Sequence, residues 1–143
     1  MNALESINRV RQFFESLSPE SIGQIETIYA EDAWFKDPFN EVRGLPAVRR
    51  IFEHMFEQVD APHFAIRDFA VTGEQAFLTW DFTFRFKRSP ESKQVIQGAT
   101  HLRFSPEGKV TFHRDYWDAA GELYEKLPVL GGLMRFVRKR ASS

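Results

Sequence analysis

Four side chains able to transfer protons lie where the sequence predicts strands. His113 and Asp115 are two residues apart, so they share one face of a strand, because successive side chains point to opposite faces. Asp81 lies in a strictly alternating segment, and Asp37 ends a short extended one. In an apolar cavity, burial and a neighbouring like charge raise the pKa of one carboxyl above that of its partner. The sequence therefore predicts one protonated and one ionised carboxyl, the pair that general acid–base catalysis needs.

Each of these residues also has a structural interpretation. Asp37 stands ahead of a proline, where aspartate commonly caps a turn. Asp115 can form an ion pair with Arg85 or Arg103, although we favour the site for it. His113 can be a hydrogen-bonded wall residue with no part in catalysis. The two interpretations predict different surroundings for the same side chains.

The composition is that of one folded domain with an unusual number of aromatic rings. The chain has 143 residues, of which 15 are phenylalanine, and 43% are hydrophobic. This content excludes a disordered chain, and the absence of cysteine excludes disulfides, a thiolate zinc site and a cysteine nucleophile. The net charge of −1 creates no field that would attract nucleic acid. No apolar run approaches the ~20 residues of a spanning helix, and the N-terminus has no signal-peptide pattern, so we expect a cytoplasmic protein.

The sequence predicts neither a metal ion nor a cofactor. The histidines are scattered, and none forms a His-x-x-x-His pair on a helix. Glycines occur at turns rather than in a phosphate-binding run. The histidine positions are His54, His63, His101 and His113.

Hydrophobic periodicity predicts helices first and strands afterwards. Apolar residues recur at spacings of three and four in the first part of the chain and then alternate. Helices followed by an antiparallel meander indicate the α+β class, and a curved sheet wrapped over three helices encloses a cone open at one end. We expect one domain, 1–143, in which 128–143 is a short amphipathic basic tail. The predicted helices are 4–17, 19–29, 45–59, 121–127 and 130–138, and the predicted strands are 33–38, 63–71, 76–87, 95–104 and 109–117.

One motif lies at residues 28–38, Ile-Tyr-Ala-Glu-Asp-Ala-Trp-Phe-Lys-Asp-Pro, and is followed by Arg43-Gly44 ahead of the third helix. In this motif and in the order of its elements, the chain resembles the nuclear transport factor 2-like (NTF2-like) superfamily, in its SnoaL-like and ketosteroid isomerase-like branch. The resemblance implies a conical α+β fold with a mostly apolar pocket for a small hydrophobic or polycyclic molecule. It leaves the function open, because isomerases, dehydratases, cyclases, epoxide hydrolases and proteins without catalytic activity share this fold.

The resemblance to ketosteroid isomerase concerns three positions. It places Asp37 where that enzyme has its general base. It places Phe13 and Thr100 where the enzyme has the donors that hold its dienolate. Since losing one such donor typically costs ~2.7–4 kcal/mol of transition-state stabilisation, the resemblance implies a different reaction here.

A second motif lies at residues 108–118, Gly-Lys-Val-Thr-Phe-His-Arg-Asp-Tyr-Trp-Asp, and resembles the end of limonene epoxide hydrolase. The resemblance places Asp115 at the aspartate that activates water and Asp81 at the aspartate that protonates the epoxide oxygen. The arginine that bridges these aspartates in that enzyme falls on Thr79. Its water-holding tyrosine and asparagine fall on Phe35 and Asp37.

The same resemblance implies that Asp81 and Thr79 point into the pocket. The aromatic residues that alternate with them in the predicted strand 76–87 would then lie on the convex face of the sheet. Simple alternation predicts the reverse, with the aromatic residues buried and Asp81 in water. An exposed aromatic strip is an aggregation hazard unless another subunit covers it, so we expect a homodimer through the convex sheet face. The strip consists of Trp80, Phe82, Phe84 and Phe86, and the expected pocket lining is Phe13, Phe35, Phe52, Phe56, Thr79, Thr100, Leu102 and Trp117.

The tail is apolar on one side and basic on the other, with Arg135, Arg138, Lys139 and Arg140 as its charges. Such a segment can dock on an anionic membrane surface or close the mouth of the pocket. The interpretation that we favour is a terminal helix packed on the sheet, with a frayed basic end.

Three functions fit these features. The first is a cofactor-independent enzyme that uses Asp37 and Asp115 as acid and base, with Asp81 or His113 assisting. The second is a non-catalytic carrier or sensor that binds a hydrophobic ligand in the same pocket. The third is an interaction module that uses the convex face.

Overall fold

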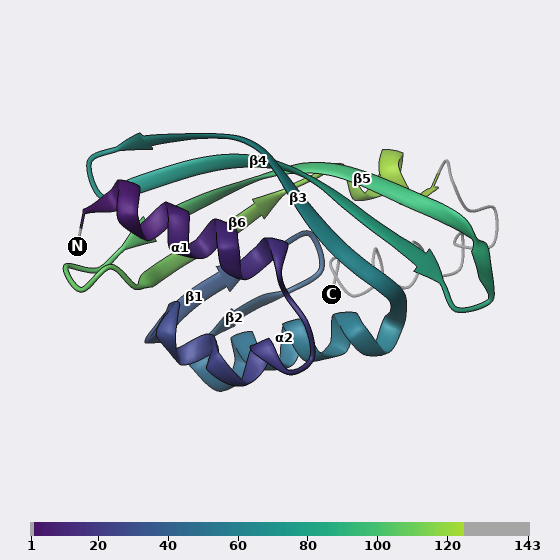
Figure 1. The fold of residues 1–143 in the computed structure, drawn as a ribbon, viewed down its shortest axis with the longest axis horizontal. Coiled ribbons are helices and arrows are strands. Elements are labelled where there is room, and N and C mark those ends of the chain that lie inside the picture. Colours follow the sequence, from purple (N-terminus) through teal and green to yellow (C-terminus); the bar gives the residue numbers. More distant parts are fainter. Residues whose placement is uncertain (1, 125–143) are drawn as a thin grey trace, which may run out of the picture.

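The computed structural model describes residues 2–124, in which long strands arch over the helices (Figure 1). Helices followed by these strands confirm the predicted α+β class. The predicted helix 130–138 and the tail 128–143 lie outside the described residues. In chain order the elements are α1 (Ala3–Glu15), η1 (Ser21–Thr27), β1 (Tyr29–Lys36), β2 (Glu41–Arg43), α2 (Leu45–Gln58), β3 (Val59–Thr72), β4 (Gln75–Phe86), β5 (Ser89–Phe104), β6 (Val110–Tyr116) and η2 (Ala120–Tyr124).

The strands form one six-stranded sheet in the order β2-β1-β6-β5-β4-β3. Four neighbouring pairs are antiparallel, whereas β1 and β6 run parallel. In the parallel pair Phe35 lies beside His113, and Lys36 lies beside Arg114. This pairing brings the first strand of the chain against the strand that carries the histidine and Asp115.

The two α-helices begin at residues that satisfy their first turns. The Asn2 side chain accepts a hydrogen bond from the Glu5 N–H at 2.8 Å and caps α1. Gly44 precedes α2 with a φ of +101°, a conformation that favours glycine. Its N–H donates to the Ala33 carbonyl at 2.8 Å and ties the start of α2 to β1. No helix within residues 2–124 has the length and apolar character needed to cross a membrane.

The second predicted helix is shorter and tighter than expected. Instead of a helix over 19–29, the chain forms the 3-10 helix η1, and Tyr29 already begins β1. The apolar residues Ile22, Ile25 and Ile28 recur every three residues. That spacing matches the three residues per turn of a 3-10 helix better than the 3.6 of an α-helix.

Several strands differ from their predicted extents, since β1 begins at Tyr29 rather than at residue 33 and β3 begins at Val59 rather than at residue 63. Strand β2 was not predicted, because three residues are too few to display alternation. Strand β5 begins at Ser89 rather than at Val95, because the chain turns at residues 87–88, before the expected turn at residues 89–92. Of the predicted helix 121–127, the described part belongs to the π-helix η2.

Four aromatic side chains of β4, Trp80, Phe82, Phe84 and Phe86, lie on the core side of the sheet, so the predicted convex strip is wrong. Trp80 and Phe84 are buried in the core, and Phe82 and Phe86 pack against it. The ring of Phe64 on β3 lies 4.6 Å from that of Phe82, measured between centroids. Burial of these rings removes far more apolar surface from water than burial of the polar side chains between them would. Simple alternation therefore decides which face of β4 is inside.

Replacing a buried leucine should destabilise the protein far more than replacing an exposed one. Leu102 on β5 is 0% exposed, whereas Leu4 on α1 is 53% exposed. We predict that Leu102→Ala lowers the free energy of unfolding by about 2–5 kcal/mol. Leu4→Ala should change it by about 0.5 kcal/mol or less. Urea denaturation followed by circular dichroism measures both values, and equal losses would contradict the burial of Leu102.

Candidate active site

A buried histidine joins two strands at the centre of the sheet. His113 on β6 is 2% exposed. Its Nδ1 lies 2.8 Å from the hydroxyl of Tyr29 on β1, and its Nε2 lies 2.7 Å from Oδ1 of Asp115. Both ring nitrogens thus have partners, as a buried imidazole requires. The structure places His113 and Asp115 on one face, as their alternation predicts.

The same carboxylate oxygen has a second hydrogen-bond partner. The Thr100 hydroxyl on β5 donates to Asp115 Oδ1 at 2.6 Å, and Trp80 Nε1–H on β4 donates to the Thr100 oxygen at 2.8 Å. The pairing of Thr100 with Asp115 across β5 and β6 sets this contact. A continuous chain of hydrogen bonds therefore runs from Tyr29 through Asp115 to Trp80. We call these five side chains, Tyr29, His113, Asp115, Thr100 and Trp80, the buried network.

Asp115 is the most solvent-exposed side chain of the buried network. Its side chain is 18% exposed, whereas that of His113 is 3% exposed. Tyr29, Thr100 and Trp80 are also buried. Burial, followed by the charge of Asp115, raises the pKa of the Tyr29 phenol well above its ordinary value. The phenol is therefore protonated throughout the physiological pH range.

Asp37 caps a turn, as its structural interpretation predicts. Its Oδ1 accepts hydrogen bonds from the N–H groups of Phe39 and Asn40, at 2.8 and 2.7 Å, so it caps the turn between β1 and β2. Burial nevertheless raises the pKa of Asp37 above its ordinary value; the Phe39 and Asn40 hydrogen bonds oppose this shift, and the charge of Asp115 adds to it. The two carboxyls are close enough to interact because Asp37 follows directly on the paired residues of β1 and β6.

The expectation that Asp81 and Thr79 face the same cavity as Asp115 is wrong. Both side chains lie on the opposite, outer face of β4, because their neighbours Trp80 and Leu78 occupy the inner one. Asp81 is buried there beneath Arg67, whose guanidinium forms an ion pair with it. Asp81 therefore does not belong to the constellation that contains Asp115.

Aromatic rings, among them the predicted lining residue Phe35, pack around His113 on the inner side. The ring centroid of Phe35 lies 4.4 Å from that of the histidine, and that of Phe14 lies 5.8 Å from it. Phe52 contacts Phe35 at 6.1 Å and Phe13 at 6.3 Å. These rings fill the floor of the cone, so the polar atoms of the imidazole are shielded from water. Leu102 is buried beside them, and Phe56 and Trp117 are half-buried at the edge of the core.

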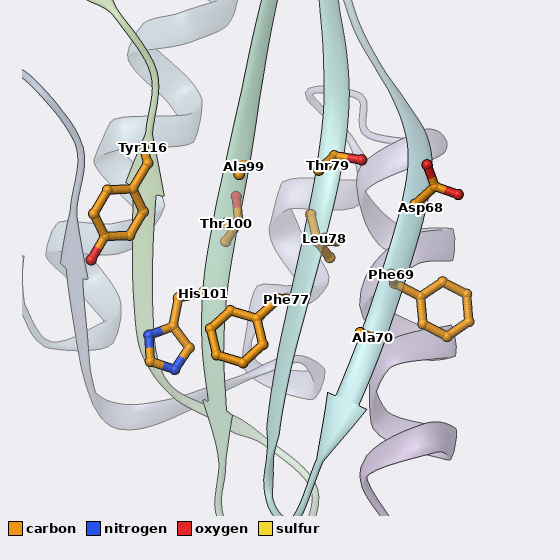
Figure 2. A pocket seen from close by; sticks show the side chains of 10 residues that line it. All are labelled: Asp68, Phe69, Ala70, Phe77, Leu78, Thr79, Ala99, Thr100, His101 and Tyr116. Carbon is orange, nitrogen blue, oxygen red and sulfur yellow. The ribbon is translucent and has the colours of Figure 1, made fainter.

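The outer face of the sheet carries a groove that sequence reasoning missed (Figure 2). Its volume is about 580 Å³. Phe77 and Tyr116 are 43% and 50% exposed there, and the ring of His101 stacks on Phe77 with centroids 4.4 Å apart. The alternation of Phe77 with the buried residues of β4 was the available signal. The lining residues are Asp68, Phe69, Ala70, Phe77, Leu78, Thr79, Ala99, Thr100, His101 and Tyr116.

No group of three or more His, Cys, Asp or Glu side chains within residues 2–124 is arranged to hold a metal ion. The candidate site is accordingly built from two interacting carboxyls, one of them fixed by a buried histidine, above a floor of phenylalanine rings.

Helices beneath an arched sheet, with a buried polar network among phenylalanine rings, form the NTF2-like fold. Residues 10–113 match the SnoaL-like domain family, and the chain belongs to this family. The predicted resemblance is thereby confirmed. No curated protein matches the sequence significantly.

Solved structures share the fold at low sequence identity. An LEH-like epoxide hydrolase from M. tuberculosis is 18% identical, with a TM-score of 0.72 over 96% of this chain and 98% of that one. A putative SnoaL-like polyketide cyclase from Jannaschia is 13% identical, with a TM-score of 0.70 over 83% and 87%. A protein from Catenulispora acidiphila with a ketosteroid isomerase-like fold is 18% identical, with a TM-score of 0.71 over 84% and 90%.

The raised pKa of Asp37 predicts a pH-dependent effect of its replacement. A carboxyl whose pKa is raised on folding stabilises the fold fully below its unfolded pKa, and this contribution is lost as the pH rises through the folded value. Asp37→Asn removes the titration but keeps an oxygen for the turn. The free energy of unfolding of Asp37→Asn minus that of wild type should therefore increase between about pH 3 and pH 7.

Urea denaturation at several pH values measures this difference. The exposed Asp32→Asn serves as the matched control and should show no such increase. A difference for Asp37→Asn that falls with rising pH would contradict the raised pKa.

Proposed function

We propose that this protein binds a small hydrophobic molecule in its cone and transfers a proton to and from it without a cofactor. Asp115 is the base, because it is the most exposed member of the buried network and its Oδ1 is the acceptor of two hydrogen bonds. Asp37 is the acid, since burial and the charge of Asp115 favour its protonated form. The single observation that carries this proposal is the pair of interacting carboxyls in different surroundings.

An acid and a base at one site suit several reactions of the family. The base removes a proton from a carbon acid or from water, and the acid protonates the oxygen on which charge develops. Isomerisation, dehydration, cyclisation and epoxide opening each use such a pair. The similarity to an epoxide hydrolase and to a putative polyketide cyclase supports this range of chemistry.

A non-catalytic carrier or sensor is the second candidate. The observation that favours it is the turn at the end of β1, where Asp37 already accepts four hydrogen bonds from Phe39 and Asn40. A carboxyl engaged in this way holds the turn rather than a substrate. This candidate predicts saturable binding of a lipid-like ligand and no product.

The base can be tested without knowledge of the natural substrate. In 5-nitrobenzisoxazole, removal of the C3 proton by a carboxylate breaks the N–O bond and releases a coloured cyanonitrophenolate. We predict that the protein catalyses this elimination and that Asp115→Asn lowers the rate by about 100-fold or more. Asp68→Asn, on the outer face, is the control and should retain the wild-type rate.

Equal rates for wild type and Asp115→Asn would contradict the assignment of the base. Saturable binding of the probe to wild type without elimination would support the carrier instead.

The partner that we propose is a second copy of the chain, bound through the outer face of the sheet. Exposed Phe77 and Tyr116 lie there around the groove, and exposed aromatic side chains on a sheet mark contact surfaces. Asp68 on β3 and Arg114 on β6 carry opposite charges toward opposite sides of this face. A two-fold axis along the strands would therefore set the acidic side of one copy over the basic side of the other.

A charge at the centre of this face should separate the copies. We predict that wild type is a dimer by light scattering and that Phe77→Arg is a monomer, because a buried unpaired charge is costly at an interface. Leu4→Arg, on the exposed side of α1, is the matched control and should leave the dimer intact. A monomeric wild type would refute the dimer.

A further inference from the structure

The direction of each hydrogen bond in the buried network can be assigned from donor chemistry. The indole N–H of Trp80 can only donate, so the Thr100 oxygen accepts it. The single hydroxyl proton of Thr100 is then directed to Asp115 Oδ1, at 2.6 Å. This arm of the network delivers one proton donor to one carboxylate oxygen.

The second arm is assigned in the same way. A carboxylate oxygen is an acceptor, so the hydrogen bond at 2.7 Å requires a proton on Nε2 of His113. When the ring carries this proton alone, Nδ1 is an acceptor, and the phenol of Tyr29 donates to it at 2.8 Å. The raised pKa of Tyr29 is consistent with this role, because it keeps the phenolic proton in place.

We propose that Trp80 and Tyr29 are positioning residues that direct two donors onto Oδ1 of Asp115 and leave Oδ2 as the oxygen that reacts. The inference rests on the proposed role of Asp115 as the base. Neither residue need touch the substrate, since each acts through an intermediate side chain, Thr100 or His113.

A glycine provides the space that Trp80 needs. Gly98 on β5 lies opposite Trp80 in the register of β4 and β5. A Cβ atom at position 98 would lie 2.4 Å from the indole Cη2, closer than atoms can approach. The indole therefore lies flat over Gly98 and reaches Thr100, two residues further along the strand. Gly98→Ala would displace the ring while leaving every hydrogen-bonding group in the protein.

Three titratable side chains face Asp115 and enter its pH dependence. Asp37 lies at the end of β1, Tyr29 lies within β1, and His113 lies on β6 beside the carboxylate. On β5 the facing group is the Thr100 hydroxyl, which does not titrate. The helices present the rings of Phe14 and Phe52 to this region.

The tautomer of His113 is the first test, and it requires no substrate. Nitrogen-15 NMR of the wild-type protein should show a neutral ring with the proton on Nε2. Tyr29→Phe should keep this tautomer but change the Nδ1 resonance, because the acceptor loses its donor. Tyr116→Phe, on the outer face, should change neither. A proton on Nδ1 in the wild-type protein would overturn the assigned direction of this arm.

The second test compares variants of the indole arm by the pH at which the carbon-13 resonance of the Asp115 carboxyl titrates. Removal of a donor from Oδ1 should move this midpoint upward by about 0.5–1 pH unit in Trp80→Phe, Gly98→Ala and Thr100→Val. Thr100→Ser keeps the hydroxyl and should restore the wild-type midpoint. Trp34→Phe, which removes an indole from the outer face, is the matched control.

The same variants then report on elimination of 5-nitrobenzisoxazole. We expect kcat to fall about 10-fold in Trp80→Phe and Gly98→Ala, with the acid limb of the rate profile moved to higher pH and KM little changed. An unmoved midpoint in Trp80→Phe would overturn the positioning role. A moved midpoint together with an unaltered rate in Asp115→Asn would instead refute the proposed function and leave the hydrogen-bond assignment standing.

Discussion

The arrangement of this protein depends on the need to satisfy both nitrogens of a histidine that lies among phenylalanine rings. Removing an imidazole from water costs free energy unless each ring nitrogen has a hydrogen-bond partner. Tyr29 supplies one partner and Asp115 the other, and they come from opposite ends of the chain. The apolar floor makes these bonds strong, because water does not compete for them. The packing of the phenylalanine rings and the hydrogen bonds of His113 therefore depend on each other.

Much of the fold could be predicted from local patterns, because helices and strands bury apolar residues at different periods. Five of the six strands were recognised in this way, and so was the shared face of His113 and Asp115. Alternation also gave the correct inner face of β4, whereas the comparison with an epoxide hydrolase gave the wrong one for Asp81. The apolar pattern of this sequence reports which of its own side chains are buried. Aligning a residue with another protein assumes that the side chain has the same orientation in both.

The rest of the site could not be predicted, since it depends on contacts between distant segments. Tyr29 was assigned to a helix, so its hydroxyl had no place in the expected pocket. The donor role of Trp80 followed only from the pairing of β4 with β5, which sets the indole over Gly98. The turn at Asp37 was foreseen as an alternative to a catalytic role, yet the residue combines the turn with a raised pKa. The spacing of residues in the sequence does not reveal that one carboxyl both caps a turn and has a raised pKa.

The parallel pairing of β1 with β6 has a consequence for how the protein is made. The hydrogen bond between Tyr29 and His113 joins residues 84 positions apart. During synthesis the helices and the first strand emerge long before the last one, so the Tyr29 hydroxyl lacks its His113 partner until most of the chain exists. Contacts of such long range slow folding, because the entropy of closing the loop is lost before the contact forms. The hydrogen bonds of His113 and Asp115 therefore form only when the final strand closes the sheet.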